Sequence, residues 1–164
     1  MILVALGSNL KSLDFGDPQQ ALEAALRAFA GRGVAVVHKS SWYRSAPVPP
    51  SSQPWFTNGV VSVETKHDPF HLLGLLHEIE RDFGRVRTVR NESRIIDLDL
   101  LAYDELLADG SSGLVLPHPR IAERAFVLHP LREIVPAWQH PVTGETPDQM
   151  LERLPEGQQL QRIG

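Results

Sequence analysis

The stretch RIIDLDLLAY, from Arg94 to Tyr103, places two aspartates two positions apart in an aliphatic run. Its β-branched and aliphatic residues predict a strand. Successive side chains of a strand point to opposite faces, so Asp97 and Asp99 would share one face, roughly 6–7 Å apart. Leu98 and Leu100 would point the other way, toward helices. The stretch therefore predicts one strand of a sheet with a pair of acids on it.

The rest of the chain supplies helices and strands in an ordered succession. We expect strands over Met1–Leu6, Val34–Tyr43, Asn58–Glu64 and Ile95–Tyr103, and helices over Pro18–Phe29, from Asp68 to Gly84, and from Thr146 toward Leu154. The order strand, helix, strand, strand, helix, strand is that of the ferredoxin-like split βαβ unit. We therefore predict an α+β fold with an antiparallel sheet and helices packed on one face. An irregular and helical C-terminal part follows.

Length and composition fit a single domain over residues 1–164. A net charge of -4 and a pI near 5.9 disfavour a general binder of nucleic acid or anionic membranes. The absence of cysteine excludes disulfide scaffolds, thiolate zinc sites and cysteine nucleophiles. No apolar run approaches the ~20 residues of a membrane helix, and the N-terminus has no basic leader. We expect a cytoplasmic monomer that acts on small molecules, with no nucleic-acid or membrane partner.

The acid pair Asp97 and Asp99 is a candidate metal site. Two carboxylates this close repel each other unless a cation lies between them. Ligands that offer only oxygen suit Mg²⁺, which keeps several waters and takes its other ligands from substrate phosphates. The alternative is a solvated sheet edge, because two aspartates at this spacing are common and can simply face water.

A cationic segment precedes the acids. Its five arginines, Arg81, Arg85, Arg87, Arg90 and Arg94, outweigh Asp82 and Glu92, so the segment carries +3 in a chain of -4. Guanidinium groups can bind phosphate bidentately, and arginine outnumbers lysine thirteen to three in this chain. Phosphoryl transfer needs such cations on the outer phosphate oxygens and a metal on the inner ones. A basic surface loop that contacts RNA is the alternative, but acids and arginines together favour a nucleotide triphosphate.

Histidine and glutamate side chains nearby are further candidates. Glu80 follows His77 by three positions, so both can line one edge of their helix; alone, each is typical of a solvated helix residue. The sequence HEIER is not a zinc signature, because Arg81 stands where the second histidine would be. His118 lies between two prolines, where it either reaches a phosphate or only forms part of a turn.

The assembled motifs resemble the 6-hydroxymethyl-7,8-dihydropterin pyrophosphokinase family of folate biosynthesis. Six blocks carry the resemblance over nearly the whole chain: ALGSNL (5–10), YRSAPV (43–48), QPWFTN (53–58), EIERDFGRVR (78–87), RIIDLDLL (94–101) and LPHPRIAERAFVLHPL (116–131). The block from Arg94 to Leu101 matches the most specific signature of the family, and the blocks occur in the family's order and approximate spacing.

The resemblance implies an ATP-dependent pyrophosphokinase. Such an enzyme transfers pyrophosphate from Mg-ATP to the hydroxymethyl group of 6-hydroxymethyl-7,8-dihydropterin, giving the pterin diphosphate and AMP, a step in tetrahydrofolate biosynthesis. By matching position, the implied catalytic residues are Arg85, Arg94, Asp97 and Asp99, with two Mg²⁺ ions at the two aspartates. The implied ATP contacts are His77, Glu80, Arg85, Arg87, Arg94, Leu100, His118 and Arg124. The pterin would lie between Phe56 and Phe126, with its polar edge toward Asn58, Asp97 and the segment that includes Ser45, Ala46 and Val48.

The chain departs from the family pattern in a few places. Asn91-Glu92-Ser93 stands where the family usually shows Gly-Pro, often preceded by tryptophan, before the signature arginine. Pro119 replaces a residue that is commonly aromatic, and Gly113 falls where a basic residue often contacts ATP. These departures concern the loop before Arg94 and the contacts with the nucleotide. We therefore expect the protein to remain catalytically active.

Two other functional classes are to be weighed. An RNA- or nucleotide-binding module without catalysis would need exposed aromatic side chains on the sheet face. A metal-dependent phosphohydrolase would use Asp97 and Asp99 with water as the nucleophile, and it would leave the block QPWFTN without an explanation.

Overall fold

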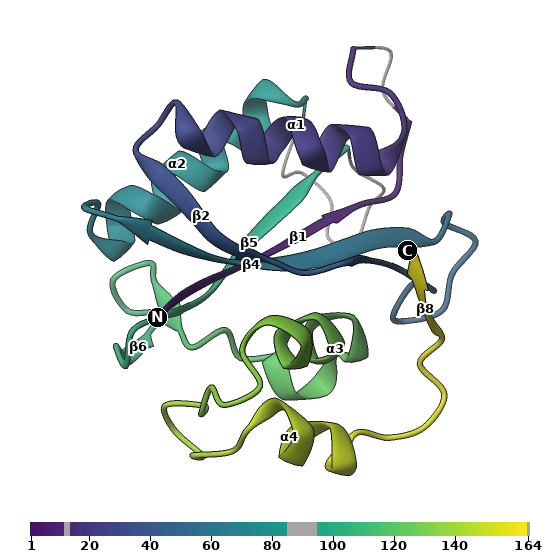
Figure 1. Ribbon diagram of the computed structural model, residues 1–164, viewed down its shortest axis with the longest axis vertical. Coiled ribbons are helices and arrows are strands. Elements are labelled where there is room, and N and C mark those ends of the chain that lie inside the picture. The colour runs from purple at the N-terminus through teal and green to yellow at the C-terminus, as the bar shows by residue number, and fades with distance from the viewer. Residues whose placement is uncertain (12–13, 85–94, 164) are drawn as a thin grey trace.

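The chain forms an antiparallel sheet between two layers of helices (Figure 1). The computed structural model describes residues 1–11, 14–84 and 95–163. Within these ranges the sheet contains β1 (Ile2–Ser8), β2 (Val34–Lys39), β3 (Trp42–Ser45), β4 (Phe56–Thr65), β5 (Asp97–Tyr103) and β8 (Leu160–Ile163). The strand order is β5-β1-β4-β3-β8, and β2 also pairs with β4. A separate short hairpin joins β6 (Ala108–Asp109) to β7 (Val115–Leu116).

β1 lies between β4 and β5 and is antiparallel to both. Gly7 of β1 lies opposite Asn58 of β4 on one side and opposite Asp97 of β5 on the other. These three residues therefore form one row across the sheet. The antiparallel pairing and the strand order confirm the predicted ferredoxin-like split βαβ fold.

The helices cover both faces of the sheet (Figure 1). One face carries α1 (Pro18–Ala30) and α2 (Pro69–Asp82), and the other carries α3 (Ala125–Ile134) and α4 (Pro147–Arg153), with the 3-10 turn η1 (Ile121–Glu123) before α3. Asp17 and Asp68 cap α1 and α2, each accepting a backbone N–H of the first turn, and a proline follows each. The prediction of helices on one face thus holds for α1 and α2, whereas the C-terminal helices cover the opposite face. None of the helices in the described ranges is long and apolar enough to cross a membrane.

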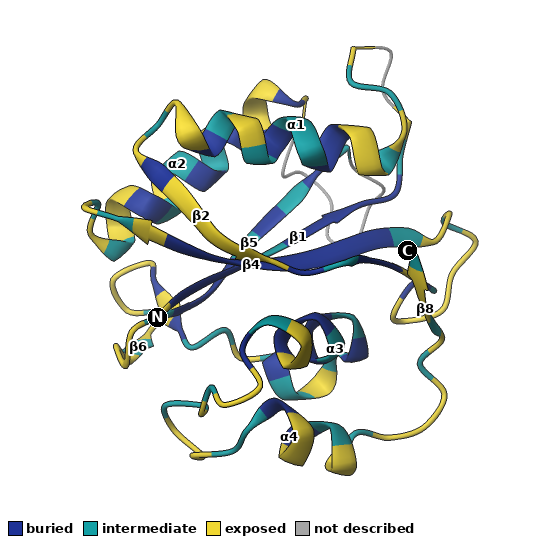
Figure 2. Cartoon of the chain, viewed as in Figure 1, coloured by how far each residue is buried: buried dark blue, intermediate teal, exposed yellow. Residues whose placement is uncertain are grey.

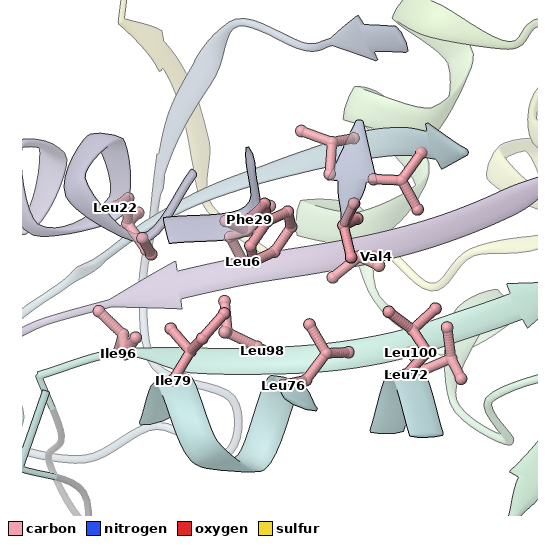
Figure 3. Packing of buried hydrophobic residues seen from close by; sticks show 14 of the residues in the cluster. Val4, Leu6, Leu22, Phe29, Leu72, Leu76, Ile79, Ile96, Leu98 and Leu100 are labelled. Atoms are coloured by element: carbon pink, nitrogen blue, oxygen red, sulfur yellow. The ribbon is translucent and has the colours of Figure 1, made fainter. Parts of the chain in front are cut away.

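Each face of the sheet has its own hydrophobic layer. Val4 of β1 packs toward α1 and α2, and its neighbour Leu3 packs toward α3. Figure 3 shows the first layer, in which Leu98 and Leu100 of β5 lie on the side of Ile79 in α2. The predicted orientation of these two leucines toward helices is therefore confirmed. Figure 2 shows the buried strands β1 and β4 between the helix layers, whereas β2 and the outer helix surfaces are exposed.

The prediction of one strand over Val34–Tyr43 is wrong. β2 ends at Lys39 and β3 begins at Trp42, although both pair with β4. Between them, Ser40 donates its own N–H to the carbonyl of Val60 and accepts the N–H of Val60 on its side-chain oxygen, each at 3.0 Å. The hydroxyl thus replaces a strand-to-strand bond and interrupts the strand. The pattern of apolar residues does not reveal such a side-chain bond.

The strand β8 was not predicted either. It is four residues long and largely exposed, and it pairs with the edge of β3, where Leu160 lies opposite Ser45. A short polar strand at a sheet edge has little hydrophobic pattern, so the sequence gives a weak signal for it.

Replacing Ser40 with alanine tests the interruption between β2 and β3. We expect Ser40→Ala to lower the free energy of unfolding by about 1–3 kcal/mol, because the buried N–H of Val60 loses its acceptor. Urea denaturation measures the change, with Ser112→Ala at an exposed position as the control. Equal stability of the two variants would show that the hydroxyl of Ser40 contributes nothing.

Candidate functional site

A pocket of about 140 Å³ lies where β1 ends and β4 and β5 begin, beside the start of α3. Its lining includes all seven residues predicted to bind the pterin: Ser45, Ala46, Val48, Phe56, Asn58, Asp97 and Phe126. Asp99 and Arg124 line it as well. A protein cavity of about 150 Å³ can hold a benzene ring, so this pocket has room for a flat aromatic ring.

Asp97 and Asp99 line the pocket from one face of β5, whereas Leu98 and Leu100 are buried on the opposite face. Both acids are partly exposed, and Nη1 of Arg124 lies 4.0 Å from Oδ2 of Asp99. Two carboxylates on one accessible face fit Mg²⁺, which completes its shell with water and phosphate oxygens. Among the described residues no group of three or more histidine, aspartate or glutamate side chains could hold a metal ion. An ion at this pair would therefore depend on ligands from water or a substrate.

Arg124 connects the acidic part of the pocket with its aromatic part. It directly precedes α3, and its guanidinium lies over the ring of Phe126, 5.5 Å from the centroid. Burial lowers the pKa of Arg124, and Asp99 opposes that shift. A guanidinium nevertheless stays charged at neutral pH. Arg124 can therefore offset the acids and also meet an anionic ligand.

The Asn58 side chain is held in a defined orientation. It is only 5% exposed, and its Nδ2 donates to Oγ of Ser45 at 2.5 Å. On the neighbouring strand Gly7 leaves room for the amide, because a Cβ at Gly7 would lie 2.9 Å from Oδ1 of Asn58. Gly7 was missed as a site residue, and its place in the block ALGSNL was the available signal.

Two half-buried phenylalanines stand on the walls of the pocket. Phe56 is the first residue of β4, and Phe126 is the second residue of α3. A slot between aromatic rings suits a flat heterocycle, which gains from stacking as well as from burial. Elements distant in sequence thus place two aromatic side chains in the same pocket as the acid pair.

The loop that follows β3 is fixed to the end of β1. Nδ2 of Asn9 donates to Oε1 of Gln53 at 3.1 Å and to the carbonyl of Pro54 at 3.3 Å. Gln53 also lines the pocket. Sequence reasoning missed these contacts, although the residues belong to the blocks ALGSNL and QPWFTN.

Four predicted ATP contacts are not among the residues that line the pocket: His77, Glu80, Leu100 and His118. Glu80 of α2 is 1% exposed and accepts the N–H of Leu98 at 2.8 Å, so the expectation of a solvated helix residue is wrong. The reason is that β5 is an edge strand, whose outer N–H groups need partners other than a strand. Leu100 points its side chain into the core, so only its backbone can contact a ligand.

The arginines assigned to the phosphates belong to the segment that precedes β5 in the sequence. Arg85, Arg87 and Arg94 lie outside the described residues, as does the departure at 91–93.

His118 lies close to the pocket and is neutral. The backbone N–H of His118 donates to the carbonyl of Leu101 at 2.8 Å. The ring Nδ1 of His118 accepts the backbone N–H of Arg120 at 3.1 Å. The neutral ring therefore carries its proton on Nε2. Burial and then the charge of Arg124 lower the pKa of His118 to about 4, with Asp97 opposing. At pH 7 the ring can donate one hydrogen bond through Nε2 without adding charge.

Comparison with known proteins finds relatives over most of the chain. A family model described as 7,8-dihydro-6-hydroxymethylpterin-pyrophosphokinase (HPPK) matches residues 3–136. The 2-amino-4-hydroxy-6-hydroxymethyldihydropteridine pyrophosphokinase of Pseudomonas aeruginosa is 39% identical over 165 residues, which cover 94% of this chain and 96% of the relative. The folic acid synthesis protein fol1 of Pneumocystis carinii is 38% identical over 143 residues, or 87% of this chain, but the chain spans only 18% of that relative.

Solved structures with the same fold include longer chains. The crystal structure of wild-type Plasmodium falciparum HPPK-DHPS with pteroate matches with a TM-score of 0.71 at 14% identity. The match covers 93% of this chain and 44% of that chain. At this identity the likeness concerns the fold, and it agrees with the antiparallel sheet described above.

The low pKa of His118 predicts a defined pH dependence of stability. Between about pH 6.5 and 4 the unfolded chain binds a proton that the folded ring resists, so stability falls as the pH drops through this window. We expect His118→Gln to reduce the loss of unfolding free energy between pH 7 and pH 5 by about 1–2 kcal/mol. Urea denaturation at both pH values measures this difference. Between pH 7.5 and 8.5 both proteins should respond alike, and an unchanged loss in the variant at low pH would contradict the assignment.

Proposed function

Because this chain belongs to the 7,8-dihydro-6-hydroxymethylpterin-pyrophosphokinase family, we propose that its pocket beside β5 and α3 transfers pyrophosphate from ATP to the hydroxymethyl group of 6-hydroxymethyl-7,8-dihydropterin. The products are the pterin diphosphate and AMP. One observation carries the assignment to this pocket: two half-buried phenylalanines and a pair of acids line the same cavity of about 140 Å³. Such an arrangement suits a reaction that joins a flat heterocycle to a polyphosphate.

The pterin occupies the aromatic part of the pocket. Its ring lies between Phe56 and Phe126, and its polar edge meets the amide of Asn58, which can both donate and accept. Asp97 and the segment that includes Ser45, Ala46 and Val48 also contact the polar edge of the pterin. The bond from Asn58 to Ser45 supports this role, because it fixes the amide before the substrate arrives.

The polyphosphate occupies the acidic part of the pocket. Asp97 and Asp99 hold two Mg²⁺ ions, which supply positive charge to the phosphate oxygens. Arg124 and the Nε2–H of His118 contact the nucleotide, and Arg85, Arg87 and Arg94 do so by their positions in the family blocks. The remaining ATP contacts are assigned by family position to His77, Glu80 and Leu100.

The chemistry requires positioning and charge neutralisation and no covalent nucleophile from the chain. The hydroxymethyl oxygen bonds to the β-phosphorus of ATP while the bond from that phosphorus to the α–β bridging oxygen breaks. AMP leaves with the bridging oxygen, and the hydroxyl proton is released. Asn58 and the two phenylalanines orient the attacking oxygen, and Arg124 stabilises the charge on the phosphates.

The proposal also covers the domain organisation, the oligomeric state and the location of the protein. We assign the activity to one domain of residues 1–164, acting as a cytoplasmic monomer with ATP as co-substrate. The acidic net charge of -4 supports small-molecule substrates over nucleic acid.

The nucleotide product tests this function. With reduced pterin and Mg-ATP we expect AMP and no ADP, measured by chromatography of the nucleotides. Asp97→Asn and Asp99→Asn should each lower the rate by at least about a hundredfold, because the Mg²⁺ ions that neutralise the phosphates lose a carboxylate ligand. Their circular dichroism should match the wild type, and Asp148→Asn on the outer surface of α4 should keep the full rate. ADP as the product, or an undiminished rate in the double variant, would overturn the proposal.

Gly7 offers a separate test of the pterin position. Gly7→Ala would place a Cβ 2.9 Å from Oδ1 of Asn58, so the amide must rotate away from its position. We expect the KM for the pterin to rise about tenfold while the KM for ATP stays near the wild-type value. Gly74→Ala on α2 is the matched control, because a Cβ there meets nothing within 4 Å. Equal changes in both KM values would speak against a pterin contact by Asn58.

A further inference from the structure

The segment after α4 returns to the pocket from outside the region that the family model matches, which ends at residue 136. Oε1 of Gln158 accepts the N–H of Ala125 at 2.9 Å, and Nε2 of Gln158 donates to the carbonyl of Glu123 at 2.7 Å. These two backbone groups lie on either side of Arg124. One side chain therefore holds the backbone both before and after a residue of the pocket.

This contact completes the start of α3. The first N–H groups of a helix have no partners within the helix. Arg124, in the N-cap position, makes no capping bond with its side chain. Gln158 supplies an acceptor for the N–H of Ala125 from 33 positions along the chain. The orientation of the first turn of α3, which carries Phe126, is thus tied to the C-terminal segment.

The next two residues fix the opposite wall of the pocket. The carbonyl of Gln159 accepts the N–H of Ala46 at 3.2 Å, and Leu160 of β8 lies opposite Ser45 of β3. Figure 1 shows the chain running from α4 to the edge of the sheet, where β8 lies. Residues 158–160 therefore join the two walls of the pocket through direct hydrogen bonds.

We propose that Gln158 is a positioning residue for pyrophosphoryl transfer and acts through Arg124 and Phe126. This inference rests on the proposed function. Arg124 lies near Asp99 and over Phe126, so a shift of its backbone displaces both the phosphate-binding cation and the pterin wall. Displacements of about 1 Å can cost up to about a hundredfold in rate. The amide suits this position because it donates and accepts at once.

Gln158→Met tests the inference, because methionine keeps the length of the side chain and removes both hydrogen bonds. We expect kcat/KM for the pterin to fall about tenfold, with a lower kcat and a higher KM. The thermal midpoint should fall by only about 2–4 °C, a small loss of stability for a chain of this length. AMP formation at 25 °C, well below the midpoint, separates the kinetic effect from unfolding.

The neighbouring residue gives a matched control. Gln159→Met changes an exposed side chain of the same type and keeps the backbone carbonyl that binds Ala46. We expect wild-type kcat and KM values for it. Gln158→Glu keeps an acceptor for Ala125 and loses the donor to Glu123, so its kcat/KM should lie between those of the wild type and Gln158→Met.

The outcomes separate the two proposals. If wild-type protein forms no AMP, the proposed function fails. If the wild type is active and Gln158→Met has unchanged kcat and KM, the residue serves stability alone and the inference is overturned. If Gln158→Met does not fold, Gln158→Glu decides by the same criterion, and wild-type kinetics in that variant would overturn the inference.

Discussion

The register of β1 between β4 and β5 is the constraint on which the site depends. It sets Gly7 opposite both Asn58 and Asp97, so the amide of the pocket and a candidate metal ligand lie in one row. A slip of one residue would turn every side chain of β1 to the other face. Leu3 and Val4 are fully buried on opposite faces. Such a slip would expose or crowd these side chains, and the burial of each stabilises the fold by about 1.5–3 kcal/mol. The packing of the core therefore defines the geometry of the pocket.

Coverage of both sheet faces restricts what the molecule can bind. A ferredoxin-like module that stacks RNA bases needs an open sheet face with aromatic side chains. In the described part of this chain α1 and α2 cover one face and α3 and α4 cover the other (Figure 2). The half-buried Phe56 and Phe126 lie at a pocket instead, beside Asn58. A phosphohydrolase that uses water as the nucleophile does not require two phenylalanines beside the acids. The geometry therefore favours a flat heterocycle as the second substrate.

Periodicity and capping residues were sufficient to predict much of the fold. Apolar spacing predicted α1, the start at Asp68 marked α2, and strand alternation predicted that Asp97 and Asp99 share a face. Two of the failures have a common physical origin, which is a side chain that bonds to a distant backbone group. Ser40 interrupts a strand by bonding Val60, and Glu80 is buried because it binds Leu98. Such bonds depend on three-dimensional neighbours, so local sequence patterns do not contain them. The pterin walls were expected from the family resemblance and not from residue spacing.

The charges around the pocket explain why a metal should accompany the nucleotide. Among the described groups, Asp97 and Asp99 contribute two negative charges and Arg124 one positive charge, while His118 is neutral at pH 7 because its pKa is about 4. These described groups alone therefore carry one net negative charge, which does not favour the phosphates of ATP. Divalent cations at the acids reverse the local sign and attract the same phosphates. On the proposed function, the acid pair thus selects the metal-bound form of ATP, and a neutral His118 can donate its hydrogen bond without disturbing that balance.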